Sequence, residues 1–209
     1  MSWEFNSAVA DIFSSHARKH IPDYDKVLQL SIDLCRDRVS PDSPILEIGC
    51  AVGATVDLLH QQGFTNIHAV DNSEHMLKKC NKEIAQYYCS DTFPTNKIKF
   101  DGVICNWTLH FMKNKKAYLK QIRNNLSPNG FLILTEKTEN SGISLQRYHE
   151  FKKSCGVSEQ EINEKARSLE GVMFIDTVDW YLKNLKNVGF QKINVINATW
   201  CFTTFLATL

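Results

Sequence analysis

The segment with the clearest chemical signature is residues 47–53 (EIGCAVG), which follows a short apolar run and leads into a predicted helix. Glycine at 49 allows a turn without a Cβ atom in the way, and glycine at 53 allows close packing of that helix. Backbone N–H groups at the helix start could then hold the polar tail of a ligand. Because position 51 is alanine, the middle glycine of a dinucleotide G-x-G-x-x-G fingerprint is absent. The pattern favours a ligand with an amino-acid tail over one with phosphates, and a purely structural strand–turn–helix is the alternative. The candidate binding residues here are Glu47, Gly49, Cys50, Ala51 and Gly53.

An acidic residue ends the next apolar run. Asp71 lies 24 residues after Glu47, where the tip of a second parallel strand is expected. A carboxylate at that tip can accept hydrogen bonds from both ribose hydroxyls of a nucleoside. Asn72 follows as a further candidate, and Ser73 could cap the next helix. A helix-start role for Asp71 is the alternative, but the preceding glycine turn favours nucleoside binding.

Two later apolar runs also end in polar residues. Asp91 and Thr92 follow the third run, where a carboxylate could accept from an adenine amino group and the next backbone N–H could donate to the ring. Asn106 closes the fourth run. Because ligands bind outside the carboxyl ends of parallel strands, we expect Asn106 to face the group that is transferred. His110 could act as a base, although a structural role is favoured.

A parallel sheet is needed to bring these residues together. Apolar runs predict strands at 45–48, 67–70, 85–88, 100–105 and 131–135, and amphipathic stretches predict helices at 55–61, 74–81 and 115–126, with a turn at 126–130. This alternation is typical of a sheet covered by helices on both faces. Residues 192–208 predict a hairpin that turns at 197–198. We therefore expect an α/β fold with a doubly wound, mostly parallel seven-stranded sheet and a C-terminal antiparallel hairpin.

The length of 209 residues predicts a single domain, residues 1–209. Residues 1–40 predict two helices broken at Pro22. Residues 144–188 predict a helical insertion, in which Ser158 and Glu161 resemble a capping box. A connection of this length is usually functional, so we expect the insertion to form a lid over the ligand.

Composition argues against several classes of protein. Lys and Arg (24) nearly balance Asp and Glu (23), which leaves no broad electrostatic footprint for nucleic acid or an anionic membrane. The N-terminal stretch does not have the pattern of a signal peptide, and no apolar run approaches the roughly 20 residues that span a bilayer. Seven scattered cysteines without C-x-x-C predict reduced thiols in a cytoplasmic protein. His16 and His20 have i,i+4 spacing without a third ligand, so no metal site is expected.

Taken together, these motifs resemble the class I S-adenosylmethionine (SAM)-dependent methyltransferases, and within them the carboxy-SAM synthases of the tRNA wobble-uridine pathway. The likeness runs from Trp3 to the C-terminus, and its specific stretches are IPDY at 21–24, residues 47–53, DNS at 71–73, NWTLHF at 106–111, TEK at 135–137 and LEGVM at 169–173. The first and last stretches are not general methyltransferase motifs, so they favour the narrower family. The resemblance implies SAM, S-adenosylhomocysteine or carboxy-SAM as the ligand. It implies that the binding residues are Tyr24, Gly49, Asp71, Asn72, Asp91 and Asn106.

One position departs from the pattern of that family. The resemblance implies an arginine in the helical insertion that pairs with the carboxylate added to the sulfonium. In an ungapped alignment this position is Ala166, and the arginine stands one place later, at Arg167. One step along a helix turns a side chain by about 100°, so Arg167 fills the role only if the helix is shifted by one residue. Arg167 is kept as a candidate catalytic residue beside Asn106 and Tyr24.

Three functions follow, in order of expectation. Methyl transfer from SAM to an unidentified small-molecule acceptor comes first, because Ala166 offers no donor to a second carboxylate. Carboxy-SAM synthesis from SAM and prephenate is the alternative, and a non-catalytic SAM-binding partner subunit is the third. Asn106 and Tyr24 would position the reacting groups. No direct nucleic-acid or membrane partner is expected, and a homodimer is compatible with the sequence.

Overall fold

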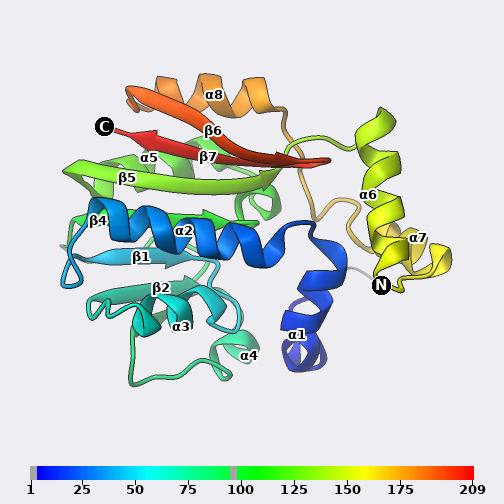
Figure 1. Cartoon of the computed structure of the whole chain (residues 1–209), viewed down its shortest axis with the longest axis horizontal. Helices are drawn as coiled ribbons and strands as arrows, with labels where there is room; N and C mark the ends of the chain where they lie inside the picture. The colour runs from blue at the N-terminus through cyan, green and yellow to red at the C-terminus, as the bar shows by residue number, and fades with distance from the viewer. Residues whose placement is uncertain (1–3, 95–97) are drawn as a thin grey trace.

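A seven-stranded sheet with the strand order β3-β2-β1-β4-β5-β7-β6 forms the centre of the molecule in the computed structural model (Figure 1). The structure describes residues 4–94 and 98–209. The first five strands pair in parallel, and β7 runs antiparallel to both of its neighbours. The predicted mixed sheet with a terminal antiparallel hairpin is therefore confirmed.

The strands and helices have the following bounds. The strands are β1 (Ile45–Ile48), β2 (Ile67–Asp71), β3 (Gln86–Cys89), β4 (Phe100–Asn106), β5 (Leu126–Lys137), β6 (Lys192–Thr199) and β7 (Phe202–Thr208). The helices are α1 (Ser7–His20), α2 (Tyr24–Arg38), α3 (Ala54–Gln61), α4 (Glu74–Leu77), α5 (Lys115–Asn125), α6 (Gly142–Ser154), α7 (Glu159–Ser168) and α8 (Val178–Asn187), with a 3-10 turn η1 (Leu109–Phe111).

The central strands are buried on both faces, which explains their uninterrupted apolar sequences. In β1, Leu46 and Ile48 pack into a cluster on the side of α5 and α8. Ile45 packs into a second cluster with residues of α2 and α3 on the opposite side. Helices α1, α6 and α7 lie beyond the carboxyl ends of the parallel strands (Figure 1). The sheet is thus covered on both faces, and a third group of helices stands over the edge where ligands bind in such sheets.

The C-terminal hairpin turns later than its sequence predicts. Asn197 and Ala198 remain paired with β7, and the chain reverses at Trp200, which has a φ of 50°. The register shift between Val195 and Asn197 lengthens β6 on its edge side, which moves the turn toward the C-terminus. The predicted turn at 197–198 is therefore wrong by about three residues.

Two other boundaries also differ. The predicted helix at 74–81 ends at Leu77, and the turn expected at 126–130 belongs to β5. Leu126 pairs with Phe100, and the Ser127 hydroxyl donates to the Asp101 carboxylate at 2.6 Å. These contacts with the start of β4 extend the strand past the point where a helix stop and turn were expected.

The predicted insertion at 144–188 divides into two parts with different roles. Helices α6 and α7 lie outside the sheet layers (Figure 1). In contrast, α8 buries Tyr181 and Leu185 completely in the core that contains Phe205 of β7. These two residues are four apart, so they lie on one face of the helix. Helix α8 is therefore a core helix, and a lid can only be built from α6 and α7.

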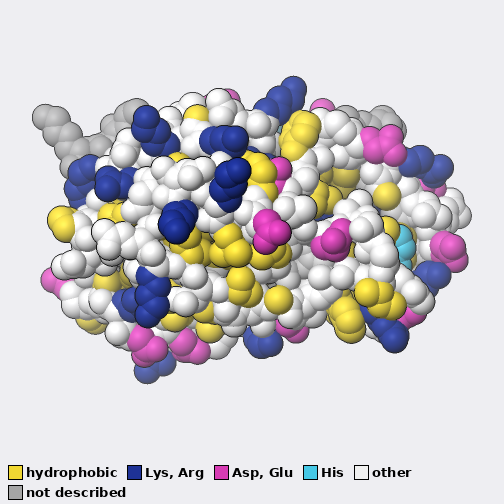
Figure 2. All heavy atoms as spheres, turned by 90° about the horizontal axis from the view of Figure 1, so that it is seen from above, with side chains coloured by type: hydrophobic (Ala, Val, Ile, Leu, Met, Phe, Trp, Pro, Cys, Tyr) yellow, Lys and Arg dark blue, Asp and Glu magenta, His cyan; other side chains and the backbone are white. Residues whose placement is uncertain are grey.

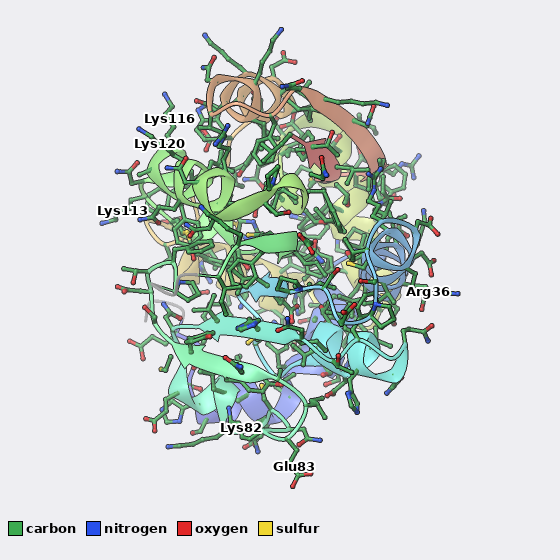
Figure 3. All side chains as sticks on the ribbon, turned by 90° about the vertical axis from the view of Figure 1, so that its left-hand side faces the viewer. Arg36, Lys82, Glu83, Lys113, Lys116 and Lys120 are labelled. Carbon is green, nitrogen blue, oxygen red and sulfur yellow. The ribbon has the colours of Figure 1, made fainter. Side chains whose placement is uncertain are left out.

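Several local predictions are confirmed. Ser158 and Glu161 form the capping box of α7, Ser73 caps α4, and the chain breaks between α1 and α2 around Pro22. On the face shown in Figure 2, side chains of both charges are present. Lys113, Lys116 and Lys120 project outward near α5 (Figure 3). Within the described residues, every helix is too short or too polar to cross a bilayer.

Candidate functional site

A cavity of about 470 Å³ lies at the carboxyl ends of the central parallel strands. Its floor is formed by the loops that follow β1, β2 and β4. Its walls come from α1, the start of α2, and the outlying helices α6 and α7. Segments that are distant in the sequence therefore enclose a space large enough for a small organic ligand.

The turn after β1 requires its first glycine. Gly49 has a φ of +72°, and a Cβ atom placed on it would lie 2.0 Å from Oγ1 of Thr108. The Thr108 hydroxyl donates to the Ile48 carbonyl at 3.2 Å, which joins the loops after β1 and β4. Gly53 has a φ of +87° and begins α3, where a Cβ atom would lie 3.2 Å from the sulfur of Cys80. The predicted turn thus has the positive φ angles and close approach that favour glycine.

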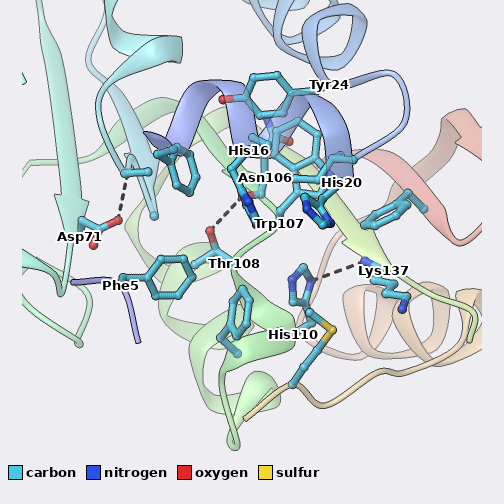
Figure 4. Close-up of a pocket in the computed structure, with 18 of the residues that line it drawn as sticks. Phe5, His16, His20, Tyr24, Asp71, Asn106, Trp107, Thr108, His110 and Lys137 are labelled. Carbon is cyan, nitrogen blue, oxygen red and sulfur yellow. Dashed lines mark hydrogen bonds between the residues drawn. The ribbon is translucent and has the colours of Figure 1, made fainter. Parts of the chain in front are cut away.

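The Asp71 carboxylate connects two loops at the floor of the cavity. It accepts hydrogen bonds from the backbone N–H groups of Ala51 at 2.9 Å and of Ser73 at 2.8 Å (Figure 4). Burial raises the pKa of Asp71 above its usual value, while these N–H donors oppose the shift. A carboxylate has about four lone-pair sites, so the two oxygens can still accept from a ligand.

Four polar atoms around the cavity are buried without a hydrogen-bond partner among the residues that the structure describes. They are Oε2 of Glu47, Oδ1 of Asn106, Nε1 of Trp107 and Nδ1 of His20. All four residues line the cavity. Leaving a buried polar group unsatisfied costs about 1–3 kcal/mol, so such groups normally have a partner. Both donors and acceptors are represented, which fits a ligand with the mixed polarity of a nucleoside joined to an amino acid.

Asn106 and Tyr24 stand at the middle of the cavity. The amide of Asn106 donates to the Ser31 hydroxyl at 3.2 Å, which leaves its oxygen free to meet a ligand. Tyr24 begins α2, and its ring stacks on Trp107 with 5.0 Å between the centroids. Burial raises the pKa of Tyr24 to about 12, so its hydroxyl stays neutral at physiological pH. These two side chains can hold a ligand in place without supplying a charge.

The end of the cavity beneath α6 and α7 is rich in lysine. Lys137 comes from the end of β5, Lys152 from α6 and Lys165 from α7, and all three line the cavity. The Lys152 ammonium lies 3.9 Å from the centroid of the Tyr148 ring. Burial, together with the neighbouring lysines, lowers the pKa of Lys152 to about 8 and that of Lys165 to about 6. Lys137 donates to Asn140 at 2.5 Å. This end of the cavity therefore holds amino groups that could pair with an anion when they are protonated.

Comparison with known proteins gives the family. A methyltransferase domain model matches residues 46–134. A carboxy-S-adenosyl-L-methionine synthase of Shewanella sediminis is 31% identical, over 98% of this chain and 92% of its own length. The chain belongs to the carboxy-SAM synthase family. It is a SAM-dependent transferase, and SAM is its cofactor.

Solved structures of low sequence identity share the fold. A SAM-dependent methyltransferase of Thermotoga maritima, described as a possible histamine N-methyltransferase, aligns with a TM-score of 0.69 at 15% identity and covers 99% of both chains. The magnesium protoporphyrin IX methyltransferase of Synechocystis, solved with bound S-adenosylhomocysteine, aligns with a TM-score of 0.64 at 16% identity. That alignment covers 100% of this chain and 90% of the other. The fold is therefore that of the class I methyltransferases.

Most of the residues predicted for the site meet at the cavity of this family member. Those that line it are Tyr24, Glu47, Gly49, Cys50, Ala51, Asp71, Asn72, Asp91 and Asn106. Three predicted residues are not part of the lining. Gly53 lies beneath the loop, and Thr92 is exposed with its hydroxyl 2.9 Å from that of Ser90. Arg167 is exposed on α7, whereas the preceding Lys165 and Ala166 face the cavity. Arg167 therefore does not line the cavity, and its role as a catalytic residue stays a prediction.

Sequence reasoning missed the lysine-rich end and much of the α1 wall. Phe5, His16 and His20 approach from the N-terminal segment, and Lys152 approaches from α6. For Lys137 a signal existed, because it belongs to the TEK stretch at the end of β5. For Lys152 none was visible, because a lysine on an amphipathic helix is normally solvated.

Proposed function

We propose that this enzyme adds a carboxyl group to the methyl group of SAM, the activity for which its relatives are named. The single observation that carries the proposal is the group of lysines at the far end of the cavity. When bound, SAM supplies a methyl group activated by a sulfonium. A second, carboxylated substrate is what the lysines would hold beside it.

The residues at the floor of the cavity would bind SAM. We place the amino-acid tail against the loop at 49–53, the ribose hydroxyls on Asp71 and the adenine near Asp91. Asn106 and Tyr24 would then flank the methyl group. This placement gives a partner to the buried oxygens of Glu47 and Asn106, which lack one among the described residues.

Charge and burial at the lysine end favour a carboxylate. Lys152 is only 6% exposed, and among the described residues its ammonium group has no ion pair with an acidic side chain. Burying an uncompensated charge is costly, and the low pKa of Lys152 expresses that cost. A bound carboxylate would stabilise the protonated lysine through charge-assisted hydrogen bonds of about 1.5–3 kcal/mol each. The site is therefore poorly suited to a neutral methyl acceptor and well suited to an anionic donor.

The test is to incubate the purified protein with SAM and prephenate and to detect carboxy-SAM by mass spectrometry. We expect product from the wild type and a loss of at least tenfold in kcat/KM for prephenate in Lys152→Met. Two variants serve as matched controls. Lys153→Met removes the next lysine of α6, whose ammonium pairs with Glu159 at the surface, and Arg167→Ala removes the exposed arginine of α7. Both controls should retain wild-type activity. Absence of carboxy-SAM from the wild type would refute the proposal.

Methyl transfer is the second candidate function. It is favoured by Ala166, which presents no hydrogen-bond donor to a carboxylate where the family resemblance implies an arginine. The same protein preparation distinguishes the two functions. If methyl transfer is the reaction, S-adenosylhomocysteine should accompany the purified protein, and prephenate should leave SAM unchanged.

A further inference from the structure

His110 and Glu136 form a buried pair at the cavity that cofactor binding does not explain. Glu136 is completely buried, and its Oε2 lies 2.7 Å from Nδ1 of His110. His110 is only 3% exposed, yet it is part of the cavity lining. Figure 4 shows His110 and Tyr24 on opposite sides of the group of side chains that line the cavity.

The glutamate accepts most of its hydrogen bonds from the loop that follows β4, and the Tyr181 hydroxyl of α8 lies 3.5 Å from its Oε2. Its oxygens accept from the backbone N–H groups of Thr108 at 3.2 Å, Leu109 at 2.8 Å and His110 at 2.8 Å. These three donors alone would satisfy a buried carboxylate and fix the loop. The imidazole of His110 is therefore not needed to hold Glu136 in place, which points to a separate role for the ring.

The hydrogen bond to Glu136 sets the tautomer of His110. A carboxylate can only accept, so Nδ1 must carry the hydrogen across the 2.7 Å contact. The longer approach of the Lys137 backbone N–H to the same nitrogen, 3.5 Å, is too weak to reverse this assignment (Figure 4). Nε2 is left as the reactive nitrogen, and no described residue forms a hydrogen bond with it.

Three other histidines line the cavity, His16, His20 and His149, and burial lowers the pKa of each. Burial lowers the pKa of His16 to about 4 and that of His20 to about 3, and the nearby lysines add to the effect. Neither ring is protonated at neutral pH. In His110 the Glu136 carboxylate contacts Nδ1, and this contact leaves Nε2 as the nitrogen available for proton transfer.

We propose that His110 is the proton-transfer residue of this enzyme and that Glu136 is its positioning residue. The inference rests on the proposed function. Replacing a methyl hydrogen by a carboxyl group requires that one proton leave the methyl carbon. With prephenate as donor, the bond from the ring to its carboxyl carbon breaks, its electron pair makes the ring aromatic, and hydroxide leaves. Protonated His110 gives its Nε2 proton to the departing hydroxide, which becomes water. The neutral Nε2 then takes one proton from the methyl carbon. The electron pair left on that carbon forms the new bond to the carbon dioxide released from prephenate, and His110 ends protonated, as it began.

The test combines spectroscopy, binding and turnover. In protein labelled with 15N-histidine, NMR should show that the neutral form of His110 carries its hydrogen on Nδ1, and Glu136→Gln should shift the balance between the two neutral tautomers. His110→Asn keeps an N–H in the position of Nδ1 but has no atom in the position of Nε2. We expect it to bind S-adenosylhomocysteine within about threefold of the wild type by calorimetry. Its turnover should fall by about 10²–10⁴-fold, the range for general acid–base catalysis.

Three outcomes separate the possibilities. Turnover of His110→Asn within fivefold of the wild type, or a wild-type spectrum with the hydrogen on Nε2, would overturn the role of His110 and leave the proposed function standing. A wild type that makes no carboxy-SAM would refute the proposed function and, with it, the role of His110. Loss of turnover in His110→Asn with retained binding and the expected tautomer would support both.

Discussion

Asp71 is the residue whose replacement should weaken cofactor binding most directly. Its two oxygens already accept from the backbone N–H groups of Ala51 and Ser73, and the residue lines the cavity. If both ribose hydroxyls donate to these oxygens, Asp71→Ala removes two charge-assisted hydrogen bonds. At about 1.5–3 kcal/mol each, the loss is about 3–6 kcal/mol. Because about 1.4 kcal/mol corresponds to a factor of ten, Kd for SAM should rise by about 10²–10⁴-fold.

The measurement must separate lost ligand contacts from a distorted loop. Calorimetry should measure the affinity of the wild type and of Asp71→Ala for two compounds, S-adenosylhomocysteine and an analogue that lacks the ribose hydroxyls. The four affinities form a thermodynamic cycle. The wild type should bind the analogue more weakly, and the variant should bind both compounds almost equally. Asp57→Ala removes an exposed carboxylate from α3 and should leave the affinity unchanged. An unchanged SAM affinity in Asp71→Ala would refute the ribose assignment. A further large loss for the analogue in that variant would place the hydroxyls elsewhere.

Three further predictions concern stability, coverage of the cofactor and pH. Gly49→Ala should lower the free energy of unfolding by about 2–4 kcal/mol in urea titrations, because its Cβ would clash with Thr108, whereas Gly63→Ala, with nothing within 4 Å, should cost about 1 kcal/mol. Hydrogen exchange should slow in α6 and α7 when S-adenosylhomocysteine is added and stay unchanged in α8; protection confined to residues 47–110 would contradict a lid. The pKa of Lys165 in the folded protein, about 6, lies below its ordinary value of 10.5. The unfolded chain therefore binds more protons between these pH values, and the free energy of unfolding should rise with pH across that window. Lys165→Met should flatten this rise, and an equal slope in the variant would contradict the assignment.

The sequence predicted the parallel core closely because its signals are local. The predicted run at 45–48 has the bounds of β1. This short, mostly apolar run stands between a proline-containing loop and a glycine turn, so its two ends are marked in the sequence itself. The boundaries that failed depend on pairing partners. The start of β5 is set by contact with Phe100, and the hairpin turn is set by a register shift opposite β7. Neither pairing can be recognised in the residues of one segment alone.

The same difference between local signals and long-range contacts applies to the residues of the site. Gly49 and Asp71 were predictable because a turn geometry and a strand tip determine what each side chain can do. The lysine-rich end of the cavity was not predictable, because its composition depends on how α6 packs against the rest of the protein. One contact that positions α6 is the hydrogen bond from the Tyr148 hydroxyl to the His20 carbonyl, at 2.8 Å. This bond joins residues 128 positions apart in the chain, and nothing in either segment predicts it.

The orientation of α7 decides which cation can meet the second substrate. Ile162 is only 1% exposed and anchors the buried face of the helix. Residues three and four positions later share that face, and these are Lys165 and Ala166, whereas Arg167 falls on the next face. Turning Arg167 inward would expose Ile162, at about 1.5–3 kcal/mol, and would break the capping box at Ser158, at about 1 kcal/mol more. That cost is as large as the charge-assisted hydrogen bond that the arginine would gain. The helix therefore keeps its register, and under the proposed function the substrate carboxylate would meet lysine in place of arginine.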